Sequence, residues 1–272
     1  YFDYLWKTVT FDFGNALTQG ERPIREELAE RLPATIELSV PAMIFTAAFG
    51  IFLGAFAAQH RKKPQDYAIR VFSILIYSIP VFFMGMLFQI FFSVRLDWLP
   101  LSGRIDSMLL ASWNPPTNFY IIDALIIQNW EALRSVLLHL VLPTLTLGLS
   151  LSGVYIRLTR VNMIEMLQSD FITAGRARGL SEKRLVYRHA LRNTFIPILT
   201  LIGLEFALLL AGAVLTETTF SWPGIGRYLY ERINLRDYTA VQSCIAVFAM
   251  FVAGISLIMD MLYAFIDPRV RY

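Results

Sequence analysis

The sequence predicts an all-α integral membrane protein, a polytopic helical bundle. Of its 272 residues, 56% are hydrophobic and 17% are charged, and the mean hydropathy is +0.53, which is outside the usual range of soluble domains. The apolar residues gather in five long runs. A helix rises about 1.5 Å per residue, so a run of about 20 residues crosses the roughly 30 Å hydrocarbon core of a membrane. We therefore expect five spanning helices.

Residues 1–34 precede the first run and are polar with scattered aromatic residues. The stretch "PIREELAERL" indicates a short amphipathic helix that starts at Pro23. The chain begins with Tyr1, and no basic start followed by a short apolar run indicates a signal peptide. We expect this segment to lie outside the membrane and the true N-terminus to be missing.

The predicted spans follow in order, at residues 35–58, 68–94, 135–158, 194–216 and 239–266. Pro80 and Pro143 lie inside the second and third spans, and we expect a kink at Pro80. Two connections, residues 95–134 and 217–238, fall on one side of the membrane. The connection at residues 159–193 falls on the other.

Orientation follows from the basic residues, which resist translocation. The side that holds residues 159–193 carries fourteen Lys and Arg, and the opposite side carries ten. We therefore place the richer side and the C-terminus in the cytoplasm, and residues 1–34 outside. An N-terminal segment that lies outside needs another segment to carry it across the membrane. A missing sixth spanning helix at the N-terminus or a cleaved signal peptide would serve.

The stretch "FITAGRARGLSEKRLVYRHALRN" (residues 171–193) holds six basic residues and one acid, Glu182. Gly179 suits a left-handed position after a helix, and Ser181 suits the cap of the next helix. The pattern predicts helix, turn, helix. A loop that only sets topology remains an alternative. A nucleic-acid-binding helix-turn-helix is disfavoured because there is no room for a third helix.

This stretch resembles the cytoplasmic coupling loop, the EAA loop, of ATP-binding-cassette importer permeases. The segments "DFGNAL", "RLPATIELS", "WLPLSGR", "HLVLPTLTLG", "IRLTRVNMIEML", "GAVLTETTFSWPGIGRYL", "RDYTAVQ" and "DPRVRY" resemble the B-type permease subunit of the dipeptide, oligopeptide and nickel branch. Where the general family has Glu-Ala-Ala, this chain has Thr173, Ala174 and Gly175. The resemblance implies the type I importer permease fold, with a first membrane helix before these residues.

The resemblance also implies partners and roles. Two separate ATPase subunits would bind ATP and magnesium, a second, C-type permease subunit would complete the pathway, and an external binding protein would deliver cargo. Peptides are the expected cargo, with nickel chelates, haem and oligosaccharides left open. This chain would hold no cofactor and no ATPase site, since it lacks a glycine-rich phosphate loop ending in Lys-Ser or Lys-Thr. The residues expected to couple to an ATPase are Phe171, Thr173, Ala174, Gly175, Arg176, Arg178, Gly179, Ser181 and Arg184.

Two further groups are candidates for the pathway. By the same resemblance, the aromatic connection after the fourth span is an external re-entrant segment that contacts the binding protein. An interfacial aromatic belt is the alternative. Its candidate residues are Glu217, Phe220, Trp222, Pro223 and Gly224. Within the spans, Glu205 is an acid at membrane depth, where a charge is costly. It is a candidate pathway residue or a neutral residue packed against the second permease; Gln89 and His139 are weaker candidates.

Other classes are less well supported. A secondary transporter or channel would need acid or basic relays and pseudo-symmetric halves. A membrane enzyme would need clustered catalytic residues. His60, His139 and His189 are scattered, Cys244 is the single cysteine, and no metal or catalytic site is predicted.

Overall fold

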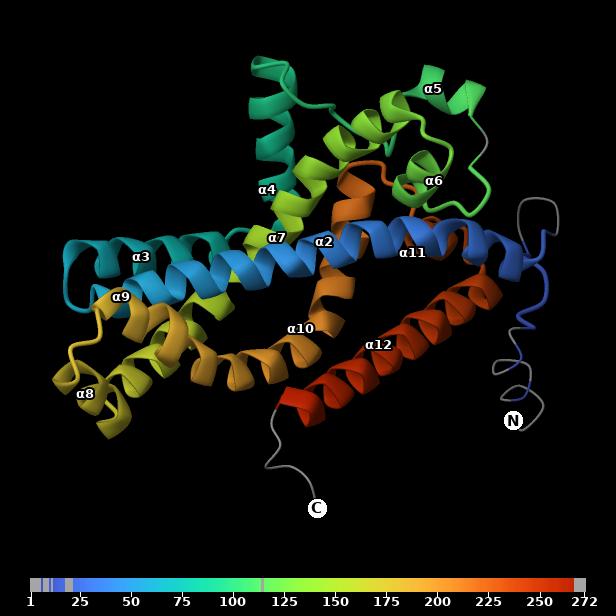
Figure 1. Cartoon of the computed structure of the whole chain (residues 1–272). Helices are drawn as coiled ribbons and strands as arrows, with labels where there is room; N and C mark the ends of the chain where they lie inside the picture. The colour runs from blue at the N-terminus through green and yellow to red at the C-terminus, as the bar shows by residue number, and fades with distance from the viewer. Residues whose placement is uncertain (1–5, 7–9, 11, 18–21, 114, 267–272) are drawn as a thin grey trace. The chain divides into compact units, whose positions relative to one another are not determined.

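The computed structural model describes residues 6, 10, 12–17, 22–113 and 115–266 (Figure 1). The side chains of residues 196, 197, 199–201, 204, 260 and 262–266 are outside the description. Thirteen residues of the predicted external start (1–5, 7–9, 11 and 18–21) and the terminal "DPRVRY" lie outside it. The described residues are helical, with an isolated bridge between Asn15 and Pro23 and no strand. The all-α prediction is confirmed.

Three helices are long and apolar enough to cross a membrane by themselves: α2 (Ile24–Gln59), α7 (Trp130–Leu167) and the Tyr238–Met259 part of α12 (Tyr238–Ile266). Helix α10 (Leu191–Thr219) covers the fourth predicted span. The second predicted span is different, because α3 (Pro64–Ser78) is followed by α4 (Val81–Phe88) and the π-helix η1 (Gln89–Arg95) at a bend of 102°.

Pro80 is the reason for this break. It has no amide hydrogen for a helical bond, and its ring favours an extended residue before it. Ile79 accordingly has φ −79° and ψ 125°. The expectation of one kinked helix over residues 68–94 is therefore corrected to two helices.

Two helices extend beyond their predicted ends. The expected amphipathic helix at Pro23 and the first span form one helix, α2, which continues through Pro33 and Pro41. Helix α7 has 38 residues, and its length of about 57 Å exceeds the hydrocarbon core. The connection at residues 159–193 therefore begins as a continuation of α7.

The connection at residues 95–134 is also structured. It contains α5 (Ser107–Ser112) and α6 (Tyr120–Ile126). The side chain of Asp106 caps α5 by accepting from the Met108 amide at 2.8 Å. Asp123 is fully buried and accepts from both the amide and the hydroxyl of Thr117.

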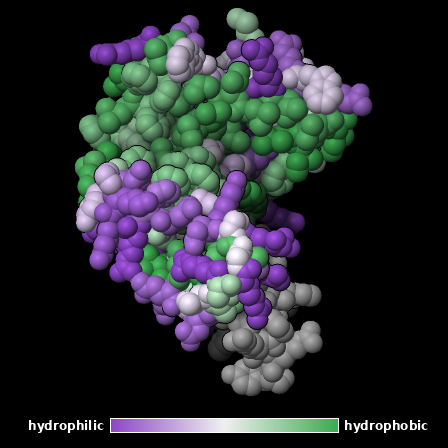
Figure 2. Space-filling view, turned by 60° about the vertical axis from the view of Figure 1, so that its left-hand side comes forward, coloured by the Kyte–Doolittle hydropathy of each residue, from purple (hydrophilic) through white to green (hydrophobic). Residues whose placement is uncertain are grey.

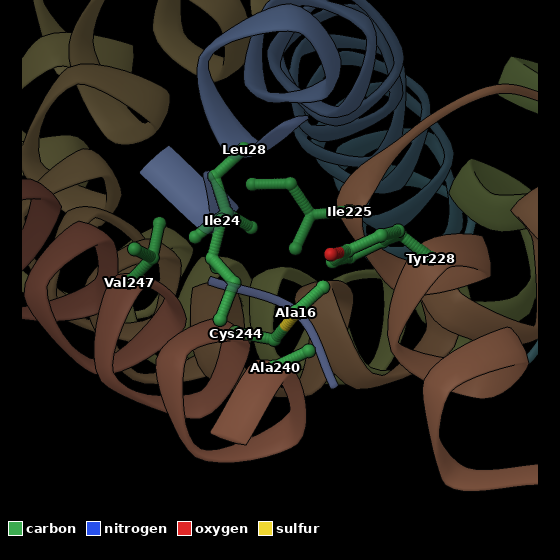
Figure 3. Packing of buried hydrophobic residues seen from close by; sticks show 8 residues of the cluster. All are labelled: Ala16, Ile24, Leu28, Ile225, Tyr228, Ala240, Cys244 and Val247. Carbon is green, nitrogen blue, oxygen red and sulfur yellow. The ribbon is translucent and has the colours of Figure 1, made fainter. Parts of the chain in front are cut away.

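The chain divides into two compact units. Unit 1 comprises Tyr1–Ala42, Val81–Leu147 and Leu208–Ala253. One of its cores joins the start of α2 to α11 (Ile225–Asn234) and α12 (Figure 3). The residues of this core are Ala16, Ile24, Leu28, Ile225, Tyr228, Ala240, Cys244 and Val247.

Unit 2 comprises Met43–Pro80, Gly148–Ala207 and Gly254–Tyr272. Here α2 contacts α7 through two glycines one helical turn apart, in the stretch "GIFLG". A methyl group on Gly50 would collide with the Cβ atom of Tyr155, and one on Gly54 would lie 2.6 Å from the Cβ atom of Thr159. Small residues at this spacing let two helices approach closely.

A third glycine brings α3 against α7. A methyl group on Gly153 would lie 2.6 Å from the carbonyl oxygen of Ser73. The start of α3 is tied to α7 by a bidentate ion pair, in which Arg160 donates to the two Asp66 oxygens at 2.6 and 2.7 Å. Helix α7 is therefore held on two sides within unit 2.

The surface agrees with a membrane protein. Many large apolar side chains are exposed, for example Ile74 at 61% and Phe91 at 51%. On the face shown in Figure 2, much of the surface is hydrophobic, and hydrophilic residues gather in its lower part and along its upper edge. Exposed apolar surface of this extent is unusual for a soluble monomer.

Candidate functional site

The predicted helix, turn, helix motif is present at residues 170–184. Helix α8 (Asp170–Ala177) is followed by Gly179 at φ 77° and by the short α9 (Glu182–Arg184). The Leu180 amide donates to the Gly175 carbonyl at 3.2 Å, and the Gly179 amide donates to the Arg176 carbonyl at 2.9 Å. These two bonds define a Schellman motif, in which glycine is favoured because the left-handed position strains other residues. The prediction for Gly179 is confirmed.

Ser181 occupies the predicted cap position of α9, with φ −65° and ψ 144°. Its side chain makes no capping hydrogen bond. The carbonyl oxygen of Ser181 instead accepts from the amides of Arg184 and Leu185 at 3.0 Å. Ser181 therefore begins the helix through its backbone.

Helix α8 has one buried side and one exposed side. Ile172 and Gly175 face inward, and a methyl group on Gly175 would lie 2.7 Å from Leu185. Gly175 therefore allows close packing within the chain. Its predicted contact with a partner stays a prediction. Other predicted coupling residues are exposed: Phe171, Thr173, Ala174, Arg176, Arg178 and Arg184.

The buried side of α8 belongs to a core in unit 2. This core joins the ends of α2 and α7 to α8 and to the π-helix η2 (Leu185–Ala190), which leads into α10. Its buried residues are Ala55, Ala58, Met163, Ile172, Leu185, Val186 and Ala190. One core therefore holds α8 against the ends of α2 and α7 and against η2.

Arg176 and Glu182 close the turn with an ion pair. Arg176 donates to the two Glu182 oxygens at 2.6 and 3.3 Å, and both side chains are about half exposed. The hydrogen-bonded guanidinium holds the pKa of the Glu182 carboxyl below its usual value. A cleft of about 240 Å³ lies beside the pair, and its polar lining includes Gln59, Arg61 and Gln168.

The second predicted site, between α10 and α11, is an internal joint. Glu217, Phe220 and Trp222 are at most 1% exposed. The Trp222 indole donates to the Ala34 carbonyl of α2 at 2.8 Å. Gly224 is also buried and Pro223 is half-buried. The buried side chains present no surface to a binding protein in this conformation, so direct contact through them is not supported.

Glu217 connects three helices of unit 1. One carboxylate oxygen accepts from the Thr35 hydroxyl of α2 at 2.7 Å, and the other accepts from the Arg227 amide in the first turn of α11 at 2.9 Å. A methyl group on Gly224 or Gly226 would collide with this carboxylate or come very close to it. A carboxylate at the positive end of a helix is electrostatically favoured. The glycines of "WPGIG" therefore make room for Glu217.

A buried ion pair that sequence reasoning missed holds the connection before α5 to α2. Arg104 donates to Glu37 at 2.5 Å and to the Asn118 carbonyl at 2.6 Å, and its guanidinium lies 3.7 Å from the centre of the Tyr120 ring. Glu37 also accepts from the Ile121 amide. The sequence signal was Glu37 itself, an acid at the start of an apolar run. Its partner lies 67 residues away.

The remaining candidates are dispersed. Gln89 donates to the carbonyls of Leu101 and Thr219, so it has a structural role within unit 1. His139 contacts Ser135 one turn earlier in the same helix. Among the described residues, no group of three His, Cys, Asp or Glu side chains could hold a metal. Glu205 lies in the middle of α10, partly buried.

The long apolar helices define a class of protein, a multi-spanning membrane protein. A family model described as binding-protein-dependent transport system inner membrane component matches residues 50–272. The chain therefore belongs to this family of ATP-binding-cassette importer permeases, and it is a multi-pass membrane protein.

Individual relatives are similar over the whole chain. The di/tripeptide transport system permease protein DppB of Pseudomonas aeruginosa is 42% identical over 272 residues, which is all of this chain and 80% of the relative. The dipeptide permease DppB of Escherichia coli K12 is 39% identical with the same coverage. The glutathione permease GsiC of Salmonella choleraesuis is 34% identical over all of this chain and 79% of the relative.

Solved structures show the same fold. A chain of the MetNI methionine ABC transporter, in inward-facing conformations, superposes with TM-scores of 0.67 and 0.69 in two crystal forms. Each match has 12% identity and covers 91% of this chain and 99% of the other. The prediction of the type I importer permease fold is confirmed.

Proposed function

We propose that this chain is one of two permease subunits of an ATP-driven peptide importer, and that α8 couples it to a separate ATPase subunit. Its relatives at 37–42% identity over nearly the whole chain are named as dipeptide or di/tripeptide permeases. The chemistry of ATP hydrolysis would then belong to two partner subunits that hold ATP and magnesium. An external binding protein would supply the cargo.

The observation that carries the coupling role is the construction of α8. One side is fixed to the ends of the long helices by the core around Ile172, and the other side exposes Phe171 at 48%. An exposed aromatic residue flanked by small and cationic residues is suited to insertion in a groove of a partner with an acidic rim. Closure of the ATPase subunits would move α8, and the shared core would pass this movement to α2, α7 and α10.

The proposed orientation puts α8 and the C-terminus in the cytoplasm and the α10–α11 joint outside. The excess of basic residues around α8 supports this arrangement. The buried joint at Glu217 and the pair at Glu37 would then keep the external connections in one conformation. They would support a binding-protein surface formed by exposed neighbours.

The test is a matched pair of substitutions in the complete complex. Ala174→Trp adds bulk on the exposed side of α8, whereas Met108→Trp adds the same ring to α5, where Met108 is 86% exposed. We expect Ala174→Trp to reduce co-purification of the ATPase subunits and ATP-dependent uptake at least about tenfold, since a blocked hot spot costs 2 kcal/mol or more. Met108→Trp should leave ATPase recovery unchanged.

Uptake into proteoliposomes with the binding protein tests the cargo. Di- and tripeptides should be transported, and nickel chelates, haem and oligosaccharides should not compete. Uptake that persists without ATP, or normal recovery of ATPase subunits with the Ala174→Trp chain, would contradict the proposal.

A further inference from the structure

Glu205 is the single charged residue in the stretch of α10 from residue 193 to residue 216. It is the middle residue of the helix Leu191–Thr219, fourteen residues from each end. It is also the middle residue of the fourth predicted membrane span, residues 194–216. An ionisable group here is costly to keep, and such groups usually face protein, water or a substrate.

The burial pattern along α10 puts Glu205 at the border of its protein-facing side. Leu209 and Thr216, four and eleven residues further along, are fully buried. The adjoining side is exposed, with Leu208 at 58% and Leu215 at 47%. Glu205 itself is partly buried, and its Oε2 atom is enclosed. The side chain therefore keeps some exposed surface although this oxygen is shielded.

Glu205 Oε2 has no hydrogen-bond partner in the part of the chain that the structure describes. Tyr155 of α7 is near enough for an electrostatic interaction with Glu205. However, the Tyr155 hydroxyl is directed to the sulfur of Met43, at 3.6 Å. Internal packing therefore does not explain the acid.

The six fully buried acids among the described residues make a clear contrast. Each has a cation, hydroxyl or backbone amide within hydrogen-bond distance, as expected for buried charges. These acids and their partners are Glu27 with Arg232, Glu37 with Arg104, Asp66 with Arg160, Asp123 with Thr117, Glu217 with Thr35, and Asp237 with the amides of Leu17 and Ala240. Glu205 differs from all six, so its partner is expected from outside the chain.

We propose that the partner is the cargo, and that Glu205 binds the α-ammonium group of a peptide during its passage. The proposal rests on the proposed peptide import. The ammonium group is the one cationic feature that peptides with a free amino terminus share, whatever their side chains. A carboxylate binds it by charge-assisted hydrogen bonds, which are strong where water is scarce. Tyr155, buried beside Glu205, would act as a positioning residue.

The first experiment is uptake by the reconstituted complex, with each value normalised to the peptide held by the binding protein. Glu205→Gln keeps the shape and removes the charge. We expect uptake of a free dipeptide to fall at least about tenfold, because a hydrogen bond to a charged group is worth that factor or more. Uptake of the N-acetylated dipeptide should change less than about twofold. Asp66→Asn removes a paired structural carboxyl and should affect both cargoes equally.

The second experiment tests access to Glu205 without any transport assay. Glu205→Cys is made in a Cys244→Ser chain, which contains no other cysteine. A cationic methanethiosulfonate reagent should label Cys at this position in the assembled complex, and loaded binding protein with ATP should slow the labelling. Absence of labelling in every nucleotide state would overturn the inference.

The outcomes separate the two proposals. If the wild-type complex takes up no peptide, the proposed function fails, whatever the labelling shows. If the wild type transports peptide and Glu205→Gln reduces both cargoes equally, or neither, then the ammonium site is wrong and peptide import stands. Such a result would favour contact of Glu205 with the second permease subunit.

Discussion

The contact of α2 with α7 makes a sharp prediction at Gly54. In Gly54→Ala the added methyl carbon would lie 2.6 Å from the Thr159 Cβ atom and 2.7 Å from the Ile156 carbonyl oxygen. Ordinary contacts of this kind are 3.4–4 Å. Neither neighbour is the flexible end of a side chain, so the two helices must move apart by about 1 Å.

The energy of this change has two parts of opposite sign. Overpacking of a tight contact costs about 1–3 kcal/mol. Alanine is a better helix former than glycine by about 1 kcal/mol, which offsets part of the cost. The net destabilisation is up to about 2 kcal/mol. For a chain of this size the midpoint of thermal unfolding should fall by up to about 8 °C.

Gly254→Ala is the matched control. Gly254 lies in α12, and a methyl group there would have nothing within 4 Å among the residues that the structure describes. The same helix-propensity gain applies without the collision, so its Tm should equal or exceed that of the wild type. Thermal unfolding of the detergent-purified complex measures both variants. A Gly54→Ala protein that melts no lower than Gly254→Ala would refute the close-packing argument.

Three other predictions follow from the contacts above. Arg104→Ala leaves Glu37 buried without its cation and should destabilise unit 1 by about 3–5 kcal/mol. We expect this loss to appear as faster proteolysis between residues 95 and 126. An unchanged rate of proteolysis would speak against the stabilising role of the ion pair. Gly179→Ala forces a side chain into φ 77° and should cost about 1 kcal/mol, with reduced ATPase coupling but normal membrane insertion. The pKa of Glu182 is lowered in the folded chain, so its pairing with Arg176 stabilises the fold fully above the unfolded pKa of about 4.5. This stabilisation is lost as the pH falls through the folded pKa. Since both groups are about half exposed, the contribution is at most about 1 kcal/mol, and Glu182→Gln should abolish this part of the acid dependence of Tm.

Features that depend on neighbouring residues were predictable. The apolar runs indicated the membrane helices, because hydrocarbon burial depends on composition over about 20 residues. Gly179 indicated its turn, because a left-handed residue after a helix is a local requirement. The break at Pro80 was placed correctly, although its bend of 102° separates two helices.

The helix ends were less predictable because charge alone does not end a helix. Helix α2 includes the charged stretch before residue 35, and α7 continues to Leu167, since the polar residues there are still good helix formers. Hydropathy marks where a helix leaves the membrane core. It does not mark where the backbone hydrogen bonds stop.

By itself, the sequence determined the class of protein, the apolar segments and the turn at Gly179, all of which follow from composition and local backbone preference. Only the tertiary structure decided which polar groups meet. Thr35 and Glu217 are 182 residues apart, and Trp222 and Ala34 are 188 apart, so no local pattern pairs them. Phe220 and Trp222 of the aromatic connection are buried, and the Trp222 indole and the Glu217 carboxylate complete hydrogen bonds inside unit 1. Contact of this connection with a partner stays a prediction. Glu205 was recognisable as an acid at membrane depth, and the structure added that six other buried acids have partners while its Oε2 atom has none among the described residues.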